Sequence, residues 1–277
     1  MNRRILITGG NRGIGAAIAE SLRRQEYEVV IVCRDRNSSM DFIRRMDGKG
    51  LAGIRFIEGD LGSMKSARAA AARIRAESPD FCAFVHNAGM WPVEKVINED
   101  GLEQSFATNH LGPFLLNRLL EDLFIKNRCR VVQVSAGLYV LGRKDCGRSA
   151  SGENFSLMKT YATTKLLNLV ATMAFAERWR DKGVTINAVH PGVVKTGLGA
   201  DIGGIRGAIL GAFKRLWLSP EKGAAAPVAL ATDQRYAGVT GAYFERFARR
   251  ALKPLAADPV FSREVWEQAI ALCEIRK

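Results

Sequence analysis

The sequence predicts an α/β fold in one domain, residues 1–277, with a doubly wound parallel sheet and helices on both faces. Short apolar runs alternate with longer amphipathic segments along the chain, and this alternation is typical of strand–helix–strand units. The apolar runs are rich in β-branched residues and nearly continuous in apolar character, as expected for strands that helices cover on both sides. No internal repeat, low-complexity linker or change of composition marks a second domain.

The same alternation places each element along the chain. The expected strands are Ile5–Thr8, Glu28–Cys33, Gly53–Glu58, Phe81–His86, Arg130–Ser135, Thr185–His190 and Ala242–Phe244. The helices expected between them are Ile14–Arg24, Ser63–Glu77, Leu102–Lys126, Thr160–Lys182 and Pro220–Thr232.

Two segments interrupt the alternation after expected strands. Residues 137–159 are rich in Gly, Ser and charge and are expected to form a long loop, whereas residues 197–218 begin with glycines and become amphipathic. Ligands of open α/β sheets bind beyond the carboxyl ends of the strands. We therefore interpret 137–159 as an active-site loop and 197–218 as a substrate lid, with a plain packing helix as the alternative for the second segment.

Composition excludes several classes of protein. With 277 residues and 47% hydrophobic content, the chain can bury a substantial core. Its five cysteines include no C-x-x-C pair, and there is no histidine cluster, so we expect no metal site, no disulfide framework and a reducing compartment. The sequence begins with a strand pattern instead of a signal peptide and contains no run long enough to cross a bilayer. We expect a soluble, cytoplasmic protein with no membrane span.

The net charge of +13 requires an explanation. The basic residues are spread along the chain and no nucleic-acid-binding module occurs, so we favour a solvated basic surface over binding to nucleic acid. An acidic partner or an anionic substrate, drawn in by long-range steering, is the remaining alternative. The basic stretch Arg246–Lys253 is the candidate surface for such a partner.

A glycine-rich turn, Thr8–Gly15 (TGGNRGIG), joins the first expected strand to the first helix. Backbone amides at a helix N-terminus point at a bound anion, and the helix dipole favours its charge. Gly9 permits the tight turn, Gly13 lets the backbone approach a pyrophosphate, and Gly15 lets the helix close on the strand. A turn that merely needs positive φ is the alternative. The strand–turn–helix context favours a dinucleotide-binding, Rossmann-type unit.

A second motif, Tyr161-x-x-x-Lys165, lies near the start of a long helical pattern. The i, i+4 spacing places both side chains on one face of the helix, one turn apart. A nearby ammonium favours the phenolate and lowers a tyrosine pKa that starts near about 10. The sequence therefore predicts that Tyr161 donates or accepts a proton near neutral pH.

Four further motifs follow the expected strands and helices in order. They are Asp60-Leu61, Asn87-Ala88-Gly89, Asn109 in ATNHLGPFLL, and Pro191-Gly192 with Thr196 in NAVHPGVVKTGL. With the glycine turn and the Tyr–Lys pair, these motifs resemble the short-chain dehydrogenase/reductase family over about residues 4–200. The patterns C-R-D, N-H-L-G-x-F-L-L and V-H-P-G-V-V are similar to its retinol-dehydrogenase-like branch, and the long segment before Tyr161 is similar to that branch and to carbonyl reductases.

The resemblance implies a role for each of these positions. Tyr161 would be the acid/base, Lys165 would lower its pKa and hold the cofactor ribose, and Asn109 would support a water relay to the lysine. Asp60 would contact adenine, and Thr196 would touch the nicotinamide carboxamide. The cofactor-binding residues would be Gly9, Asn11, Arg12, Gly13, Ile14, Gly15, Arg34, Asp60, Leu61, Asn87, Ala88, Gly89, Tyr161, Lys165, Pro191, Gly192, Val194 and Thr196.

Charge at the end of the second expected strand indicates the choice of cofactor. An acidic residue there would hydrogen-bond the ribose of NAD and repel a 2′-phosphate, but this chain has Cys33 followed by Arg34. Arg12 precedes the second motif glycine, and guanidinium groups match phosphate geometry. We expect NADP(H), with Arg36 as an assisting cation. The alternative is that Arg12 and Arg34 are ordinary surface charges.

The pattern departs from the family at the catalytic serine. Related sequences read V-S-S after the fifth strand, and the alignment places Ala136 where the second, functional serine belongs. A bulge could re-aim Ser135 into the site, Tyr139 could replace the missing donor, or the reaction could proceed without it. Losing one such donor costs about 10²–10³ in rate. Reduction of an imine or a conjugated C=C bond depends less on this serine.

We therefore expect an NADPH-dependent reductase with a Tyr161–Lys165–Asn109 site and Ser135 as the carbonyl contact. The substrate would be a lipophilic or secondary-metabolite small molecule that carries a carbonyl, an imine or a conjugated C=C bond. The alternative is a catalytically silent NADP-binding homologue that acts as a regulator or assembly partner. The two longest expected helices could pair with their copies in a homodimer, although the long loop before Tyr161 would obstruct this.

Overall fold

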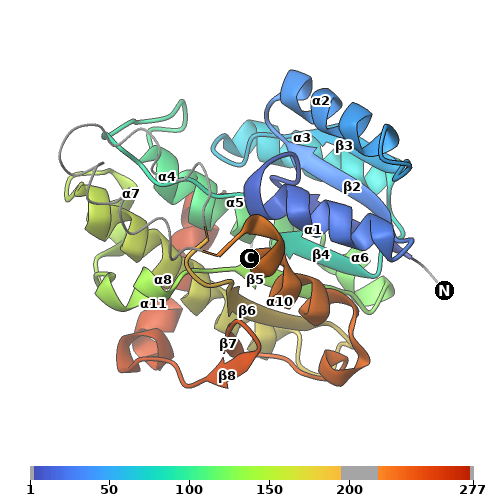
Figure 1. The fold of residues 1–277 in the computed structure, drawn as a ribbon. Coiled ribbons are helices and arrows are strands. Elements are labelled where there is room, and N and C mark those ends of the chain that lie inside the picture. Colours follow the sequence, from blue (N-terminus) through green and yellow to red (C-terminus); the bar gives the residue numbers. More distant parts are fainter. Residues whose placement is uncertain (1–2, 195–217, 275–277) are drawn as a thin grey trace.

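The computed structural model describes residues 3–194 and 218–274, and it confirms the predicted single-domain α/β fold (Figure 1). One sheet has the strand order β3-β2-β1-β4-β5-β6-β7-β8. Strands β1 to β7 pair in parallel, and β8 pairs antiparallel with β7. The strands are β1 Arg4–Thr8, β2 Glu28–Cys33, β3 Ile54–Glu58, β4 Ala83–His86, β5 Arg130–Val134, β6 Thr185–His190, β7 Tyr243–Glu245 and β8 Ala248–Arg250.

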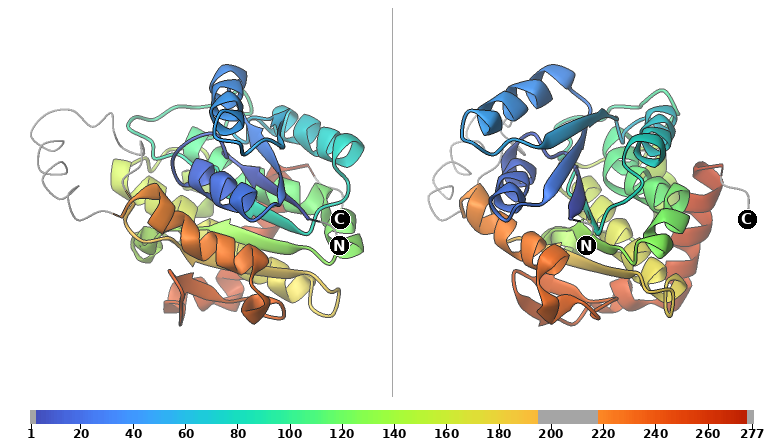
Figure 2. Two further views of the ribbon diagram at one scale, coloured as in Figure 1. Left: turned by 45° about the vertical axis from the view of Figure 1, so that its right-hand side comes forward. Right: turned by 90° about the vertical axis from the view of Figure 1, so that its right-hand side faces the viewer.

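Helices cover both faces of this sheet, as the two further views make clear (Figure 2). One face packs against α1 Gly13–Arg24, α2 Arg36–Asp47 and α10 Pro220–Thr232. The other packs against α3 Met64–Glu77, α5 Gly112–Leu119, α6 Glu121–Lys126, α8 Leu157–Arg178 and α11 Pro259–Leu272. Alternate residues of each strand therefore enter two separate cores, which explains why the strand sequences lack the polar positions of a half-exposed sheet.

The strand order fixes where a ligand can bind. β1 pairs with β2 on one side and with β4 on the other, so the direction of chain winding reverses between β1 and β4. In doubly wound sheets the crevice at such a reversal, outside the carboxyl ends of the strands, is the ligand site. The glycine turn follows β1 and the Asn-Ala-Gly motif follows β4, so both lie at this crevice.

Outside residues 137–159, two α-helices and one strand were absent from the sequence prediction: α2, α11 and β8. The N-terminal signals of both helices are present, because Asp35 accepts a hydrogen bond from the Ser38 N–H at 2.7 Å and Asp258 accepts one from the Val260 N–H at 2.9 Å. An aspartate before a helical segment is a strong start signal. In α2 this signal precedes a mostly polar segment whose buried face includes Phe42, so periodicity alone does not reveal the helix.

The expected single helix Leu102–Lys126 is wrong. The structure breaks it into α4 Gln104–Phe106, a π-helical turn Ala107–Leu111, α5 and α6. Pro113 lies in the first turn of α5 and has no N–H to donate to the Asn109 carbonyl, as a continuous α-helix would require. That carbonyl instead accepts a hydrogen bond from Asn168 Nδ2 at 2.8 Å. The break therefore leaves the Asn109 carbonyl to a partner outside its own helix.

The expectation of one long loop over residues 137–159 is also wrong. The segment contains a 3₁₀ turn Gly137–Leu141 and helix α7 Cys146–Ala150, and α8 already begins at Leu157. Asp145 starts α7 by accepting the Arg148 N–H at 3.2 Å. Most of the second interrupting segment, 197–218, lies outside the described residues, and of it only Leu218 is described.

Two expectations about the whole chain concern membranes and metals. Within residues 3–194 and 218–274, no helix has both the length and the apolar character needed to cross a bilayer. In the same residues no three His, Cys, Asp or Glu side chains gather in a way that could hold a metal ion.

Candidate active site

The glycine turn is built from close approaches. Gly9 and Gly13 have φ angles of +66° and +55°, which only glycine adopts at little cost. A Cβ on Gly15 would lie 2.1 Å from the Gly9 carbonyl oxygen, and one on Gly10 would lie 2.4 Å from Ile31 Cγ2. Gly10 was missed by sequence reasoning, although its place beside Gly9 was a signal. The turn therefore forms only with these glycines.

Hydrogen bonds tie this turn to the end of β4. Thr8 Oγ1 accepts the N–H groups of Asn87 and Ala88, both at 3.0 Å. Asn87 Nδ2 in turn donates to the carbonyls of Thr8 and Gly9, both at 3.1 Å. A Cβ on Gly89 would lie 3.4 Å from Lys165 Nζ. The Asn-Ala-Gly motif thus brings the glycine turn within reach of the helix that carries the Tyr–Lys pair.

Two arginines beside the turn are free of ion pairs within the described part of the chain. Arg12 caps α1 in an extended conformation, with φ −150°, and Arg34 follows β2; both are exposed. Arg36 differs from them, because it pairs with Glu58 at 3.1 Å and lies over the ring of Phe56.

The last position of β2 holds a cysteine instead of a carboxylate. Cys33 stands at its last position and is buried, which raises the pKa of its thiol. Asp35, two residues on, uses its carboxylate to cap α2 through the Ser38 N–H. Asn11 Nδ2, from the glycine turn, donates to Ser38 Oγ at 2.8 Å, so the turn and the start of α2 are held together.

The motif after β3 serves partly to shape its own loop. Asp60 Oδ1 accepts the Gly62 N–H at 2.8 Å, and Leu61 is buried. A Cβ on Gly112 would lie 2.5 Å from the Leu61 carbonyl oxygen, so α5 packs directly on this loop. Because the Leu61 side chain is buried, a ligand could contact only the backbone of this loop and the Asp60 side chain.

The loop after β6 begins at the same edge of the sheet. Pro191 follows the strand and Gly192 has a φ angle of +95°. Val194 is buried against Gly223, whose Cβ would lie 2.6 Å from Val194 Cγ2. Thr196 lies outside the described residues.

Tyr161 lies on α8, buried beneath the loop that follows β4. Its ring stacks on Trp91, with centroids 4.3 Å apart and planes 7° apart, and Trp91 Nε1 donates to the Leu157 carbonyl at 3.0 Å. Burial raises the pKa of Tyr161. The expected lowering of this pKa is therefore wrong for this arrangement, because the desolvation of the phenol outweighs the ammonium of Lys165.

Lys165 lies one turn further along α8 and is also buried. Its Nζ donates to the Val134 carbonyl at the end of β5, at 3.3 Å, and lies 5.7 Å from the centroid of the Tyr161 ring. Burial lowers the pKa of Lys165 to about 8. The ammonium is thus held between the end of β5 and the tyrosine, with a hydrogen bond to the strand.

The side chain of Asn109 joins the loop after β4 to α8. Its Nδ2 donates to the Met90 carbonyl at 2.8 Å and to Thr164 Oγ1 at 2.9 Å, and its Oδ1 accepts the Met90 N–H at 2.8 Å. Its main-chain carbonyl accepts from Asn168, a residue that sequence reasoning missed. Asn168 lies three positions after Lys165 on α8, and this spacing on one helix face was the available signal.

Two contacts of the structure bear on the explanations expected for the serine position. β5 and β6 stay in register through Val134 and Val189, and the Ser135 N–H donates to the Val189 carbonyl at 2.8 Å, so no bulge re-aims Ser135. Tyr139 is buried, and its hydroxyl accepts the Lys253 N–H at 3.2 Å, so this hydroxyl lies against the segment that follows β8.

The hydroxyl of Ser135 and the imidazole of His190 both lie close to the backbone around Ala136. Ser135 Oγ is buried and has no hydrogen-bond partner in the part of the chain that the structure describes. A Cβ on Gly137 would lie 3.3 Å from His190 Nε2, so this ring lies beside the backbone that follows Ala136. Burial lowers the pKa of His190, so the imidazole is neutral at pH 7.

The fold and the glycine turn define a nucleotide-binding α/β protein, and comparison with known proteins identifies its family. The short chain dehydrogenase family matches residues 3–204. Retinol dehydrogenase 14 from Homo sapiens is 31% identical over 284 residues, which cover 95% of this chain and 84% of that protein. The chain belongs to the short chain dehydrogenase family, in its retinol-dehydrogenase-like branch. It is an oxidoreductase of a family that binds nicotinamide cofactors.

Solved structures agree on the fold. A crystal structure of an uncharacterized protein from Mycobacterium paratuberculosis has a TM-score of 0.77 and 25% identity, and covers 98% of this chain and 93% of its own. L-sorbose reductase from Gluconobacter frateurii, complexed with NADPH and L-sorbose, has a TM-score of 0.70 and 19% identity, and covers 88% of this chain and 94% of its own. At that identity the second likeness concerns the fold alone.

The buried ammonium of Lys165 makes a prediction about stability. Burial lowers the pKa of Lys165 from 10.5 to about 8, so between these values the unfolded chain binds the proton more tightly than the folded chain. Stability due to Lys165 therefore rises with pH across this window. The difference in free energy of unfolding between Lys165→Met and the wild-type protein should change by about 3 kcal/mol there, at about 1.4 kcal/mol per pH unit.

Urea denaturation at several pH values from about 7 to about 10.5 measures this difference. Lys159→Met is the matched control, because Lys159 lies on the same helix and is exposed. A stability difference for Lys165→Met that stays constant with pH would contradict the burial of a desolvated ammonium.

Proposed function

We propose that the protein is an NADP(H)-dependent reductase that transfers hydride to a carbonyl, an imine or a conjugated C=C bond of a lipophilic or secondary-metabolite small molecule. The observation that carries this proposal is the burial of Tyr161 and Lys165 together, one turn apart on α8, at the carboxyl end of β5. They lie next to Gly89 at the crevice that the glycine turn borders. A proton donor, a cation and a dinucleotide cradle meet at one edge of the sheet.

The residues present fit a dinucleotide. The positive φ of Gly9 and the close approach at Gly15 leave a cradle that a side chain would fill, and the N-terminus of α1 supplies amides for a pyrophosphate. When bound, the nicotinamide would supply the hydride. Exposed Arg12 and Arg34 would bind the 2′-phosphate of NADP(H), and β2 ends in Cys33 instead of the acidic residue that would repel this group.

The buried phenol suits a reductive reaction. Burial raises the pKa of Tyr161, so its hydroxyl stays protonated and can donate its proton as negative charge develops on a substrate oxygen or nitrogen. Lys165, between Val134 and Tyr161, would hold the ribose and stabilise the phenolate that forms. Asn109 fixes the loop after β4 through Met90 and so positions the stacked Trp91.

Exposed apolar side chains support a lipophilic substrate. Val93 is 42% exposed, Val140 50%, Met158 42% and Val193 57%. They follow β4, β5 and β6 or begin α8, so all four lie toward the carboxyl edge of the sheet. Residues 137–159, with their 3₁₀ turn and α7, would border the active site, and 197–218 would form the lid. The substrate would then lie beside these exposed apolar side chains.

Ala136 favours one alternative function. An alanine offers no hydrogen-bond donor to a substrate oxygen, and this is consistent with a catalytically silent NADP-binding homologue that regulates or assembles with another protein. Retention of Tyr161 and Lys165 in a buried pair argues for the reductase, because burying an ammonium costs stability. A cytoplasmic location, a homodimer and an acidic partner on Arg246–Lys253 stay predictions.

The first test concerns the cofactor. The double variant Arg12→Ala/Arg34→Ala should raise the Kd for NADPH about 100-fold, because two charge-assisted hydrogen bonds to the 2′-phosphate are lost, and it should change the Kd for NADH less than about 3-fold. Titration followed by tryptophan fluorescence measures both. Arg36→Ala is the control, since Arg36 pairs with Glu58. Equal weakening of NADPH and NADH would contradict the NADP(H) preference.

The second test concerns catalysis. Tyr161→Phe keeps the ring that stacks on Trp91 but removes the proton donor, so kcat/KM should fall about 10²–10⁴-fold while NADPH binding is unchanged. NADPH oxidation is followed at its absorbance with a panel of aldehydes and ketones, conjugated enones and imines. Tyr236→Phe, beyond α10, is the control. A wild-type protein that binds NADPH but reduces no member of the panel favours the silent homologue.

The third test concerns the position of the missing serine. Ala136→Ser should raise kcat/KM for carbonyl substrates at least about 10-fold by restoring a donor to the substrate oxygen, and it should leave imine reduction nearly unchanged. Ser135→Ala is the matched variant on the neighbouring residue. If Ser135→Ala lowers carbonyl reduction while Ala136→Ser has no effect, Ser135 is the contact and our alignment of the serine position is wrong.

A further inference from the structure

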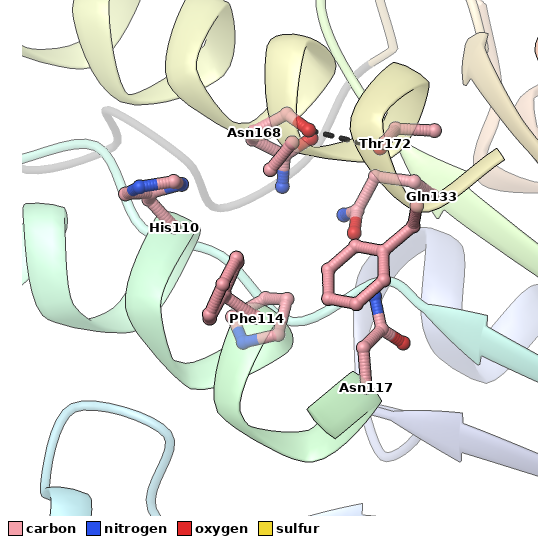
Figure 3. A pocket seen from close by; sticks show the side chains of 9 residues that line it. His110, Phe114, Asn117, Gln133, Asn168 and Thr172 are labelled. Atoms are coloured by element: carbon pink, nitrogen blue, oxygen red, sulfur yellow. Dashed lines mark hydrogen bonds between the residues drawn. The ribbon is translucent and has the colours of Figure 1, made fainter. Parts of the chain in front are cut away.

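A small cavity lies inside the core between α5, α8 and β5, near the part of α8 that follows Lys165 (Figure 3). Its volume is about 10 Å³, which is room for about one water molecule. Figure 3 shows polar side chains around it, among them His110, Gln133 and Asn168. The lining residues are His110, Pro113, Phe114, Asn117, Gln133, Asn168, Ala171, Thr172 and Phe175.

Polar atoms at this cavity have no partner among the described residues. Both ring nitrogens of His110 and the Oδ1 of Asn168 are buried without a hydrogen bond. His110 is 1% exposed and Asn168 3% exposed. Burial lowers the pKa of His110 to about 3, so its imidazole is neutral and offers one donor and one acceptor. Buried polar groups in folded proteins nearly always have a partner, either protein or ordered water.

The polar lining of the cavity contrasts with the apolar core around it. His110 lies between Phe106 and Phe114 on its own helix, with ring centroids 5.3 Å and 6.4 Å away, and the core around it is built of leucine and aromatic side chains. Apolar cavities stay dry, whereas polar cavities of this size hold a water molecule that bonds to the unsatisfied groups. A water molecule at this site would give Asn168 Oδ1 and one His110 ring nitrogen a partner without moving a side chain.

We propose that this cavity is a built binding site for one ordered water molecule, held by a His110 ring nitrogen and Asn168 Oδ1. The water makes His110 and Asn168 positioning residues for the active site. It fixes the amide of Asn168, whose Nδ2 donates to the Asn109 carbonyl at 2.8 Å. That carbonyl is the one that Pro113 leaves without a helical partner.

A second set of bonds reaches the cavity from the cofactor side. His86 ends β4, directly before Asn87, and its Nε2 lies 2.8 Å from Asn117 Oδ1. Gln133 Nε2 donates to the His86 carbonyl at 3.3 Å. Asn117 and Gln133 both line the cavity. The water therefore lies between two sets of residues. Asn117 and Gln133 hold His86, which precedes the Asn-Ala-Gly motif, and Asn168 holds the Asn109 carbonyl.

A crystal structure of the full chain tests the water site directly, without any substrate. One electron-density peak should lie within hydrogen-bond distance of Asn168 Oδ1 and of a His110 ring nitrogen, and it should be lost in a His110→Phe crystal. An empty cavity in the wild-type crystal would overturn the proposal. This result does not depend on turnover, so it stands apart from the outcome for the proposed reductase.

The change of Tm caused by His110→Phe has opposite signs for a cavity that holds water and for a dry cavity. If the cavity is dry, His110→Phe removes two unsatisfied nitrogens and raises the Tm. If it holds water, the same change removes a ligand of the water and lowers the Tm, by about 2–6 °C. His110→Gln, which keeps a donor and an acceptor, should restore most of the loss. A higher Tm for His110→Phe would overturn the proposal.

The positioning role rests on the proposed function and has its own measurement. With a substrate found in the panel above, His110→Phe should lower kcat about 10-fold and leave the KM for NADPH unchanged, and His110→Gln should recover kcat. Thr172→Val, which also lines the cavity but whose hydroxyl bonds within its helix at 2.9 Å, should keep the wild-type kcat. Loss of the water with an unchanged kcat would show that the site is structural only.

Discussion

The hydrogen bonds between Thr8 and Asn87 hold the whole site together. They join the turn after β1 to the loop after β4, across the crevice where the sheet reverses its winding. The Asn87 amide can reach two carbonyls of the turn only because Gly15 has no side chain, since a Cβ there would lie 2.5 Å from Asn87 Nδ2. The glycine spacing of the turn and the asparagine some seventy residues later are therefore one constraint, met from two distant parts of the chain.

Burial acts in opposite directions on the Tyr–Lys pair. It favours the neutral form of each group, and so raises the pKa of Tyr161 and lowers that of Lys165 to about 8. The folded chain thus keeps the phenol protonated while holding an ammonium that is close to releasing its proton. Such a pair costs stability and is unfavourable in a protein that has no use for it. This cost is the physical reason to assign chemistry to the pair.

Strands β1 to β7 could be predicted from the sequence to within two residues at each end, because β-branched apolar runs covered on both faces leave a continuous pattern, whereas the exposed β8 was not predicted. The glycine turn and the Tyr161 and Lys165 positions followed from local spacing. Three features did not. The break at Pro113 lies inside an apolar pattern that suits a helix, the raised pKa of Tyr161 depends on Trp91 from a separate loop, and the role of Asn168 depends on a carbonyl contributed by another helix.

The stacking of Trp91 on Tyr161 has a consequence for the shape of the product. The indole covers one face of the phenol at 4.3 Å and is itself fixed to the start of α8. Under the proposed function, a flat, prochiral substrate that reaches the hydroxyl would meet the indole on one side, and this favours one of its faces for the hydride. We expect one mirror-image form of the alcohol or amine to predominate, with its handedness set by a tryptophan that takes no part in the proton transfer.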